Sequence, residues 1–127
     1  MKTELSDGEW VLMNRLWQDA PKTITQLTAA LKPETGWSKH TVISMLSRLE
    51  GKGAVSWRDS GRAKEYYPLL LRGDAARRET RHFLDKVYGG RLGLMLNAMV
   101  DTQALSQQEI AELSAILEKA KGGTGHD

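Results

Sequence analysis

The sequence predicts a mainly α-helical chain that carries one small β-hairpin and divides into two units. Three amphipathic segments joined by short turns come first, and a stretch with strand periodicity around a glycine turn follows them. Three more helical segments lie beyond Pro68. Three helices followed by a hairpin are the pattern of a winged helix-turn-helix domain. The expected ranges are 5–70 for this domain, 71–121 for a second, helical domain and 122–127 for a disordered tail.

The first helix begins at a capping box. In this motif the Ser6 hydroxyl accepts a hydrogen bond from a backbone N–H, and Glu9 reaches back to the cap. Two tryptophans on the helix stripe are more typical of a core than of a binding platform. The helix should stop near Pro21, because proline cannot continue it. The apolar stripe comprises Trp10, Leu12, Met13, Leu16 and Trp17.

A second, short helix is expected from its cap, Thr23, to Leu31, with Ile24 and Leu27 turned inward. Residues 32–36 (KPETG) are rich in turn formers and predict a connector. The second and third helices are then separated by a tight turn, as in a helix-turn-helix.

The third helix, at about 38–51, has two contrasting faces. One face carries apolar side chains at the spacing of a buried stripe: Val42, Met45, Leu46 and Leu49. The other carries hydroxyls and cations, with no carboxylate before Glu50, which suits a helix laid in a DNA major groove. A plainly solvated face is the alternative, above all for His40. The candidate DNA contacts here are Ser38, Lys39, His40, Thr41, Ser44, Ser47 and Arg48.

A basic hairpin, the wing, is expected at about 54–67. Apolar Val55 and Trp57 alternate with polar residues, and DSGR at 59–62 forms the turn. Aromatic side chains are expected to cover the helices from one side: Trp57, Tyr66 and Tyr67. The candidate phosphate contacts of the wing are Arg58, Arg62 and Lys64.

Positive charge is concentrated on this third helix and wing. The whole chain has a net charge of only +2, but residues 36–64 hold six cations against two carboxylates, a net charge of +4. Residues 70–127 hold eight of each sign. Such a distribution, together with the helix and hairpin motif, favours double-stranded DNA as the partner, although charge alone is more typical of a solvated basic surface.

The C-terminal unit is expected to form three helices that cannot fold alone. Asp74 should cap the first, Gly89 and Gly90 should end it, and a capping box at 106–109 should start the last. The helix at 92–100 is apolar nearly all round and must be covered, so we expect a homodimer. The candidate dimerisation residues are Phe83, Val87, Leu92, Leu94, Met95, Leu96, Met99, Ile110, Leu113, Ile116 and Leu117.

Residues for enzyme or metal chemistry are not arranged in a recognisable site. There is no cysteine, and the three histidines, His40, His82 and His126, lack metal-ligand spacing. No phosphate-binding loop or nucleophile motif is present. We therefore expect no enzyme activity, metal or cofactor. The sequence shows neither a membrane-length apolar run nor a signal peptide, so a cytoplasmic protein without membrane insertion is expected.

Several stretches resemble a known family: LSDGEWVLMNRLW, WSKHTVISMLSRLEGKGAV, GRAKEYYPLL, FLDKVYGG, LGLMLNAMV and LSQQEIAELSAILEK. They are similar to the penicillinase repressor family, the BlaI/MecI type of bacterial winged-helix repressor, to which the copper-responsive CopY type is related. The resemblance runs from Leu5 to about Lys121 and includes the C-terminal unit. It implies a cytoplasmic homodimer that binds inverted-repeat operators with TACA/TGTA-type cores and blocks transcription.

The resemblance also implies a control mechanism. In β-lactam-responsive members a membrane-bound sensor with a zinc protease domain triggers a cut in the C-terminal unit, which corresponds to Asn97-Ala98 here. Known members have phenylalanine where this chain has Ala98. The cysteine-rich copper motif of the CopY type is absent, because the chain has no cysteine.

The leading functional hypothesis is thus a dimeric repressor that binds operator DNA. The alternative is a winged-helix module that binds a protein rather than DNA. The small net charge of +2 and the apolar segment 92–100 favour that alternative.

Overall fold

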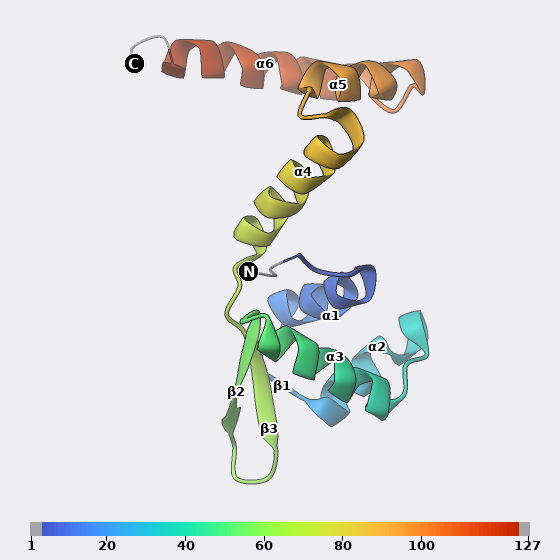
Figure 1. The fold of residues 1–127 in the computed structure, drawn as a ribbon, viewed down its shortest axis with the longest axis vertical. Helices are drawn as coiled ribbons and strands as arrows, with labels where there is room; N and C mark the ends of the chain where they lie inside the picture. Colours follow the sequence, from blue (N-terminus) through green and yellow to red (C-terminus); the bar gives the residue numbers. More distant parts are fainter. Residues whose placement is uncertain (1–3, 125–127) are drawn as a thin grey trace. The chain divides into compact units, whose positions relative to one another are not determined.

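The computed structural model describes residues 4–124, which form six helices and a three-stranded antiparallel sheet (Figure 1). This confirms the predicted mainly α-helical fold with a small hairpin. The chain divides into two compact units, and the division falls between Thr80 and Arg81, inside the fourth helix. The elements are α1 (Asp7–Gln18), β1 (Lys22–Thr23), α2 (Ile24–Thr35), α3 (Lys39–Gly51), β2 (Val55–Asp59), β3 (Lys64–Pro68), α4 (Arg72–Tyr88), α5 (Leu92–Asp101) and α6 (Gln107–Thr124).

The core of the first unit lies between α1, α2, α3 and the sheet. Its fully buried side chains are Leu12, Met13, Leu16, Leu27, Leu31, Val42, Leu46, Leu49 and Val55. The two tryptophans of α1 lie at the edge of this core, half-buried and packed edge to face, with 5.7 Å between the ring centroids of Trp10 and Trp17. The Trp17 indole also donates a hydrogen bond of 2.8 Å to the carbonyl of Leu70, which ties α1 to the segment after the wing.

The predicted connector at 32–36 is wrong, because α2 continues to Thr35 with Pro33 inside it. Proline removes one backbone donor, but two other hydrogen bonds hold this last turn. The Thr35 hydroxyl donates to the Leu31 carbonyl at 2.8 Å, and the Gly36 N–H donates to the Lys32 carbonyl at 2.8 Å. Gly36, at φ 69°, ends the helix in the left-handed conformation that glycine adopts without strain.

The sheet contains a strand that the sequence did not predict. Its order is β1-β3-β2, and Lys22 of β1 lies opposite Tyr66 of β3. A two-residue strand is too short to show period-two alternation. In the hairpin, Trp57 lies opposite Tyr66, and both pack on the core. Tyr67 lies opposite Ser56, so it faces the other side of the sheet, and its predicted role in covering the helices is wrong.

The ends of the C-terminal helices differ in two places from the prediction. α4 begins at Arg72, so Asp74 lies in its first turn, paired with Arg77, instead of capping it. The first turns of α4 belong to the first unit, where Ala75 is buried in the core. α6 extends through Thr124, so 122–124 are helical rather than a disordered tail; residues 125–127 lie outside the described part.

The second unit has no core of its own in the described chain: no side chain from Arg81 to Gly122 is buried. The glycine break after α4 is confirmed by positive φ angles at Gly89 and Gly90, and the capping box of α6 is confirmed by reciprocal bonds between Ser106 and Glu109. Large apolar side chains are exposed on all three helices, for example Val87, Leu92 and Ile116. These helices therefore present apolar surface that a single chain leaves uncovered.

Candidate nucleic-acid interface

The helix α3 is fixed at both ends and along one face. At its start, Ser38 accepts a hydrogen bond of 3.2 Å from the Thr41 N–H, which confirms the predicted cap. After its end, Gly53 takes φ 77° and turns the chain into the hairpin. The inward side chains Val42 and Leu46 are almost completely buried. A helix held this way presents its opposite face in one orientation.

The predicted contact residues of α3 lie on that opposite face. All are exposed except Thr41, which is half-buried. The hydroxyls of Thr41 and Ser38 are hydrogen-bonded to each other at 3.2 Å. Ile43 is 42% exposed, so it belongs to the outward face and not to the core. The exposed members of the predicted set are Ser38, Lys39, His40, Ser44, Ser47 and Arg48. Short donors, acceptors and cations on one helix face can bond base edges and phosphates.

The wing is the hairpin of β2 and β3, which extends past the three helices of the first unit (Figure 1). Its turn is closed by the Ser60 N–H, which donates to the Ala63 carbonyl at 3.0 Å, and by the Gly61 N–H, which donates to Asp59 Oδ1 at 2.9 Å. Arg62 is exposed at this tip. An ordered turn therefore holds a cation at the end of the hairpin, where a phosphate backbone can reach it.

The three predicted cations of the wing have different surroundings. Arg58 Nε lies 3.2 Å from Glu65 Oε1 on the neighbouring strand, and Lys64 Nζ lies 4.2 Å from the centroid of the Trp57 ring. In the described chain, the Arg62 side chain has neither an ion pair nor a hydrogen bond. Glu65 offsets part of the charge of Arg58, so Arg62 offers the least compensated charge of the wing.

A carboxylate that sequence reasoning treated only as part of a cap proves to contact α3. Glu9 is 1% exposed, and its Oε1 accepts a hydrogen bond of 2.6 Å from Lys52 Nζ. Its Oε2 lies 3.5 Å from Arg48 Nε. Burial alone would raise the pKa of Glu9, but the hydrogen bonds from Lys52 and Ser6, with the charge of Lys52, outweigh it and lower the pKa below its ordinary value.

The sequence did contain a signal for this buried contact. Glu9 precedes the buried residues Leu12, Met13 and Leu16 by three, four and seven positions, so it lies on the same helical stripe. A charge on a buried stripe needs a partner. The partner could not be named from the sequence, because Lys52 is 43 residues away.

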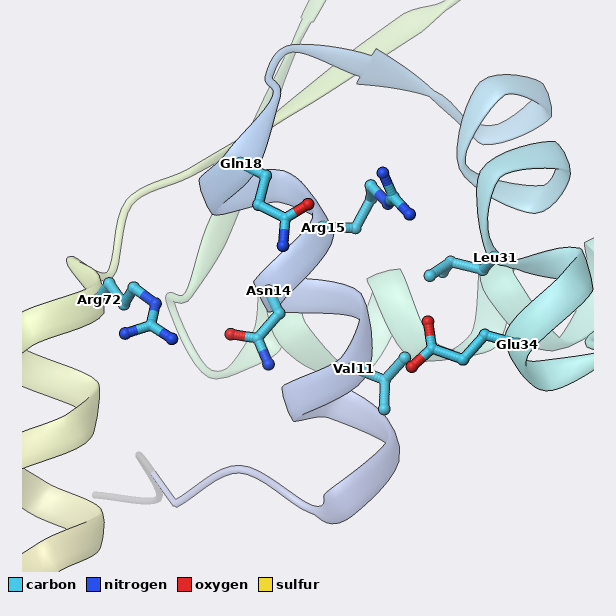
Figure 2. Close-up of a pocket in the computed structure, with 7 residues that line it drawn as sticks. All are labelled: Val11, Asn14, Arg15, Gln18, Leu31, Glu34 and Arg72. Atoms are coloured by element: carbon cyan, nitrogen blue, oxygen red, sulfur yellow. The ribbon is translucent and has the colours of Figure 1, made fainter.

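A polar pocket of about 290 Å³ lies elsewhere on the first unit, between α1, α2 and the start of α4 (Figure 2). Arg15, Glu34 and Arg72 contribute its charged side chains. The amide oxygen of Asn14 is buried there without a hydrogen-bond partner in the described structure. None of the lining residues comes from α3 or the wing, so the pocket is separate from the candidate DNA contacts.

Within residues 4–124, no group of three or more metal-ligating side chains is close enough to hold a metal ion. The described helices also include none that is long and apolar enough to cross a membrane.

Comparison with known families decides what this winged helix is. The model of a family described as penicillinase repressor matches residues 5–119. The chain belongs to the penicillinase repressor family. Among its relatives, a penicillinase repressor of Bacillus licheniformis is 31% identical over 118 residues, covering 93% of this chain and 92% of its own. The methicillin resistance regulatory protein MecI of Staphylococcus aureus is 29% identical over 116 residues, covering 91% and 94%.

Solved structures of the same family match a little over half of this chain. The DNA-binding domain of the repressor BlaI superposes with a TM-score of 0.52 at 30% identity, covering 58% of this chain and 93% of that one. Monomeric BlaI of Bacillus licheniformis in complex with the blaP half-operator gives 0.50 at 30% identity, covering 56% and 87%. A mutant MarR from E. coli, at 22% identity and a TM-score of 0.51, shares the fold alone.

The family and these structures establish the coarse function. The chain is a DNA-binding transcriptional repressor with a winged helix, and not an enzyme. The predicted family, fold class and repressor function are thereby confirmed. The same matches argue against the alternative, in which the winged helix binds a protein rather than DNA.

Proposed function

We propose that this repressor binds an inverted-repeat operator as a homodimer, with α3 in the major groove and the wing on the sugar-phosphate backbone. The observation that carries the proposal is the exposed polar and cationic face of α3, which continues into the basic hairpin. The related BlaI was solved as a monomer on a half-operator. One winged helix per half-site matches that arrangement, and two half-sites call for two chains.

The DNA contacts divide into two groups by their position. On α3, Lys39, His40 and Arg48 reach phosphates or guanine edges, while Ser44 and Ser47 bond base edges. Ser38 and Thr41 lie at the helix start, where a phosphate can also meet the backbone N–H groups. On the wing, Arg58, Arg62 and Lys64 contact the backbone and add affinity without reading the sequence.

Dimerisation is supported by the apolar surface that the second unit leaves open. Val87 is 49% exposed, Leu94 41% and Leu117 46%, on three different helices. Exposed patches of this kind mark interaction sites. A second copy is the simplest cover, since a twofold axis joins identical apolar patches to each other and pairs the winged helices. Residues of the proposed interface are Phe83, Val87, Leu92, Leu94, Met95, Leu96, Met99, Ile110, Leu113, Ile116 and Leu117.

Release by proteolysis is the proposed control, by a membrane-bound sensor protease acting at Asn97-Ala98 on a repressor in the cytoplasm. The bond lies in the middle of α5, with Asn97 exposed and Ala98 half-buried. Cleavage within a helix requires local opening, and the open fraction governs the rate. A cut there would disrupt the dimer unit and leave α3 and the wing intact, so affinity would fall toward that of one winged helix.

The test is binding of the full chain to duplexes that carry an inverted repeat with TACA/TGTA-type arms. A duplex of the same length and composition with both arms scrambled is the control. We expect specific affinity to exceed nonspecific affinity by about 10³-fold or more at physiological salt. Equal affinity for the two duplexes would reject the operator type.

A further inference from the structure

We propose that Glu9 is a positioning residue for DNA recognition: from α1 it holds the Arg48 side chain of α3 in the orientation that contacts the operator. This inference rests on the proposed function, because it assigns Arg48 to the DNA contact. It adds a residue that lies outside α3 and the wing and that does not itself touch DNA.

Hydrogen bonds from groups other than Arg48 already hold the carboxylate of Glu9 in place. Its Oε1 accepts a hydrogen bond of 2.8 Å from the Ser6 N–H and one of 2.6 Å from Lys52 Nζ. Lys52 Nζ also donates to the Glu4 carbonyl at 2.7 Å. Lys52 follows the last residue of α3, and its N–H donates to the Arg48 carbonyl at 3.0 Å. The start of α1 is thus bonded to the end of α3.

Arg48 meets the second oxygen of the same carboxylate. Its Nε lies 3.5 Å from Glu9 Oε2, while 58% of its side chain remains exposed. Contact through Nε leaves the two terminal nitrogens of the guanidinium group as donors, and these are the atoms that form bidentate bonds to phosphate or guanine. An arginine that is already oriented loses less side-chain entropy on binding.

The contact with Arg48 is not needed to bury Glu9. Lys52 already supplies an opposite charge in hydrogen-bond contact, and the N–H groups of the first turn of α1 favour a carboxylate there. Together, the side chains of Glu9, Lys52 and Arg48 carry one net positive charge. Because 58% of the Arg48 side chain is exposed, solvent screens its pair with Glu9, and the pair adds little to folding. Its effect should therefore be measured in DNA affinity.

A double-mutant cycle tests this role in the full chain. Operator affinity is measured by fluorescence anisotropy for the wild type, E9Q, R48A and the double variant, each below its unfolding temperature. We expect R48A to weaken binding about tenfold and E9Q about threefold to tenfold, within the range for an arginine contact. In the R48A background, E9Q should change affinity by less than about twofold, because the group it positions is gone.

A matched control is E109Q, which makes the same change in the capping box of α6, where Glu109 bonds Ser106. Its operator affinity should stay within about twofold of the wild type. Should E9Q fail to fold, E9D keeps the charge but shortens the side chain, and its expected loss is smaller and again absent in the R48A background.

Two results would overturn the proposal. One is an E9Q loss that is equal in the Arg48 and R48A backgrounds, which indicates a structural role alone. The other is R48A binding operator DNA as tightly as the wild type, because the side chain that Glu9 orients would then make no DNA contact that affects affinity.

The NMR signal of the Arg48 Nε–H group separates this proposal from the proposed function, because it needs no DNA. In the free repressor E9Q should shift this signal, because the change removes the carboxylate charge that lies 3.5 Å from Nε. If the wild type binds no operator, the proposed function fails, while an unchanged signal in E9Q contradicts the positioning by Glu9.

Discussion

At the scale of single residues, the neighbours of each charged side chain determine how strongly its charge can attract DNA phosphates. Arg58 is offset by Glu65 at 3.2 Å, Lys64 lies over an indole ring, and Arg62 stands alone at the tip among the described residues. Glu9 is the reverse case, a buried carboxylate with cations from two positions around it. Counting cations along the sequence could not separate these situations, because each partner comes from another strand or helix.

Arg62→Ala should weaken binding to every DNA sequence alike, since the proposed contact of the wing tip is with the backbone and not with bases. The plot of log K against log salt should become shallower by about 1, and affinity at physiological salt should fall on the order of a few-fold. Titrations of operator and scrambled duplexes across a salt series measure both effects. A loss confined to the operator would show that Arg62 reads bases.

The pH dependence of stability should depend on Glu9. Its pKa in the folded chain is lowered from 4.5, so the carboxylate stabilises the fold above that pH, and the contribution disappears as pH falls through the folded-state pKa. At neutral pH, Glu9→Gln should therefore lower the free energy of unfolding by about 1–3 kcal/mol. Urea denaturation should show this difference shrinking in acid. A difference that is constant with pH would contradict the account.

At the scale of elements, the first and second units differ in how their apolar faces are used. α1, α2 and α3 bury theirs against one another and the sheet. α6 instead leaves Ile116 62% exposed and Leu117 46% exposed. Helical periodicity predicted the stripes in both units but could not tell which stripe is covered within one chain.

Ile116→Asp should disrupt the dimer with little effect on the single chain, because this side chain is 62% exposed there. Sedimentation equilibrium should show a dimer dissociation constant raised by at least about tenfold, as for an apolar interface residue replaced by a charge. Ala115→Asp, at an exposed site on the opposite side of the same helix, is the matched control. An unchanged dimer in Ile116→Asp would remove α6 from the interface.

At the scale of the whole molecule, the sequence predicted the architecture better than its connections. The caps at Ser6, Ser38 and Ser106 and the strands of the wing follow from local rules, and the structure confirms them. Strand β1 and the contact between Glu9 and Lys52 depend on residues far apart in the chain, so periodicity did not reveal them. The extension of α2 through Pro33 contradicted a local rule; in this last turn the Thr35 hydroxyl bonds the Leu31 carbonyl and the Gly36 N–H bonds the Lys32 carbonyl.

The proposed function requires that two winged helices act together on two half-sites. It is tested most directly by comparing the affinity and stoichiometry of the full chain on an inverted-repeat operator and on a single half-site. Coupling through the dimer predicts two chains on the full operator and an affinity about 10²-fold or more above that for the half-site. One chain per duplex, with the same affinity for the operator and the half-site, would contradict the claim.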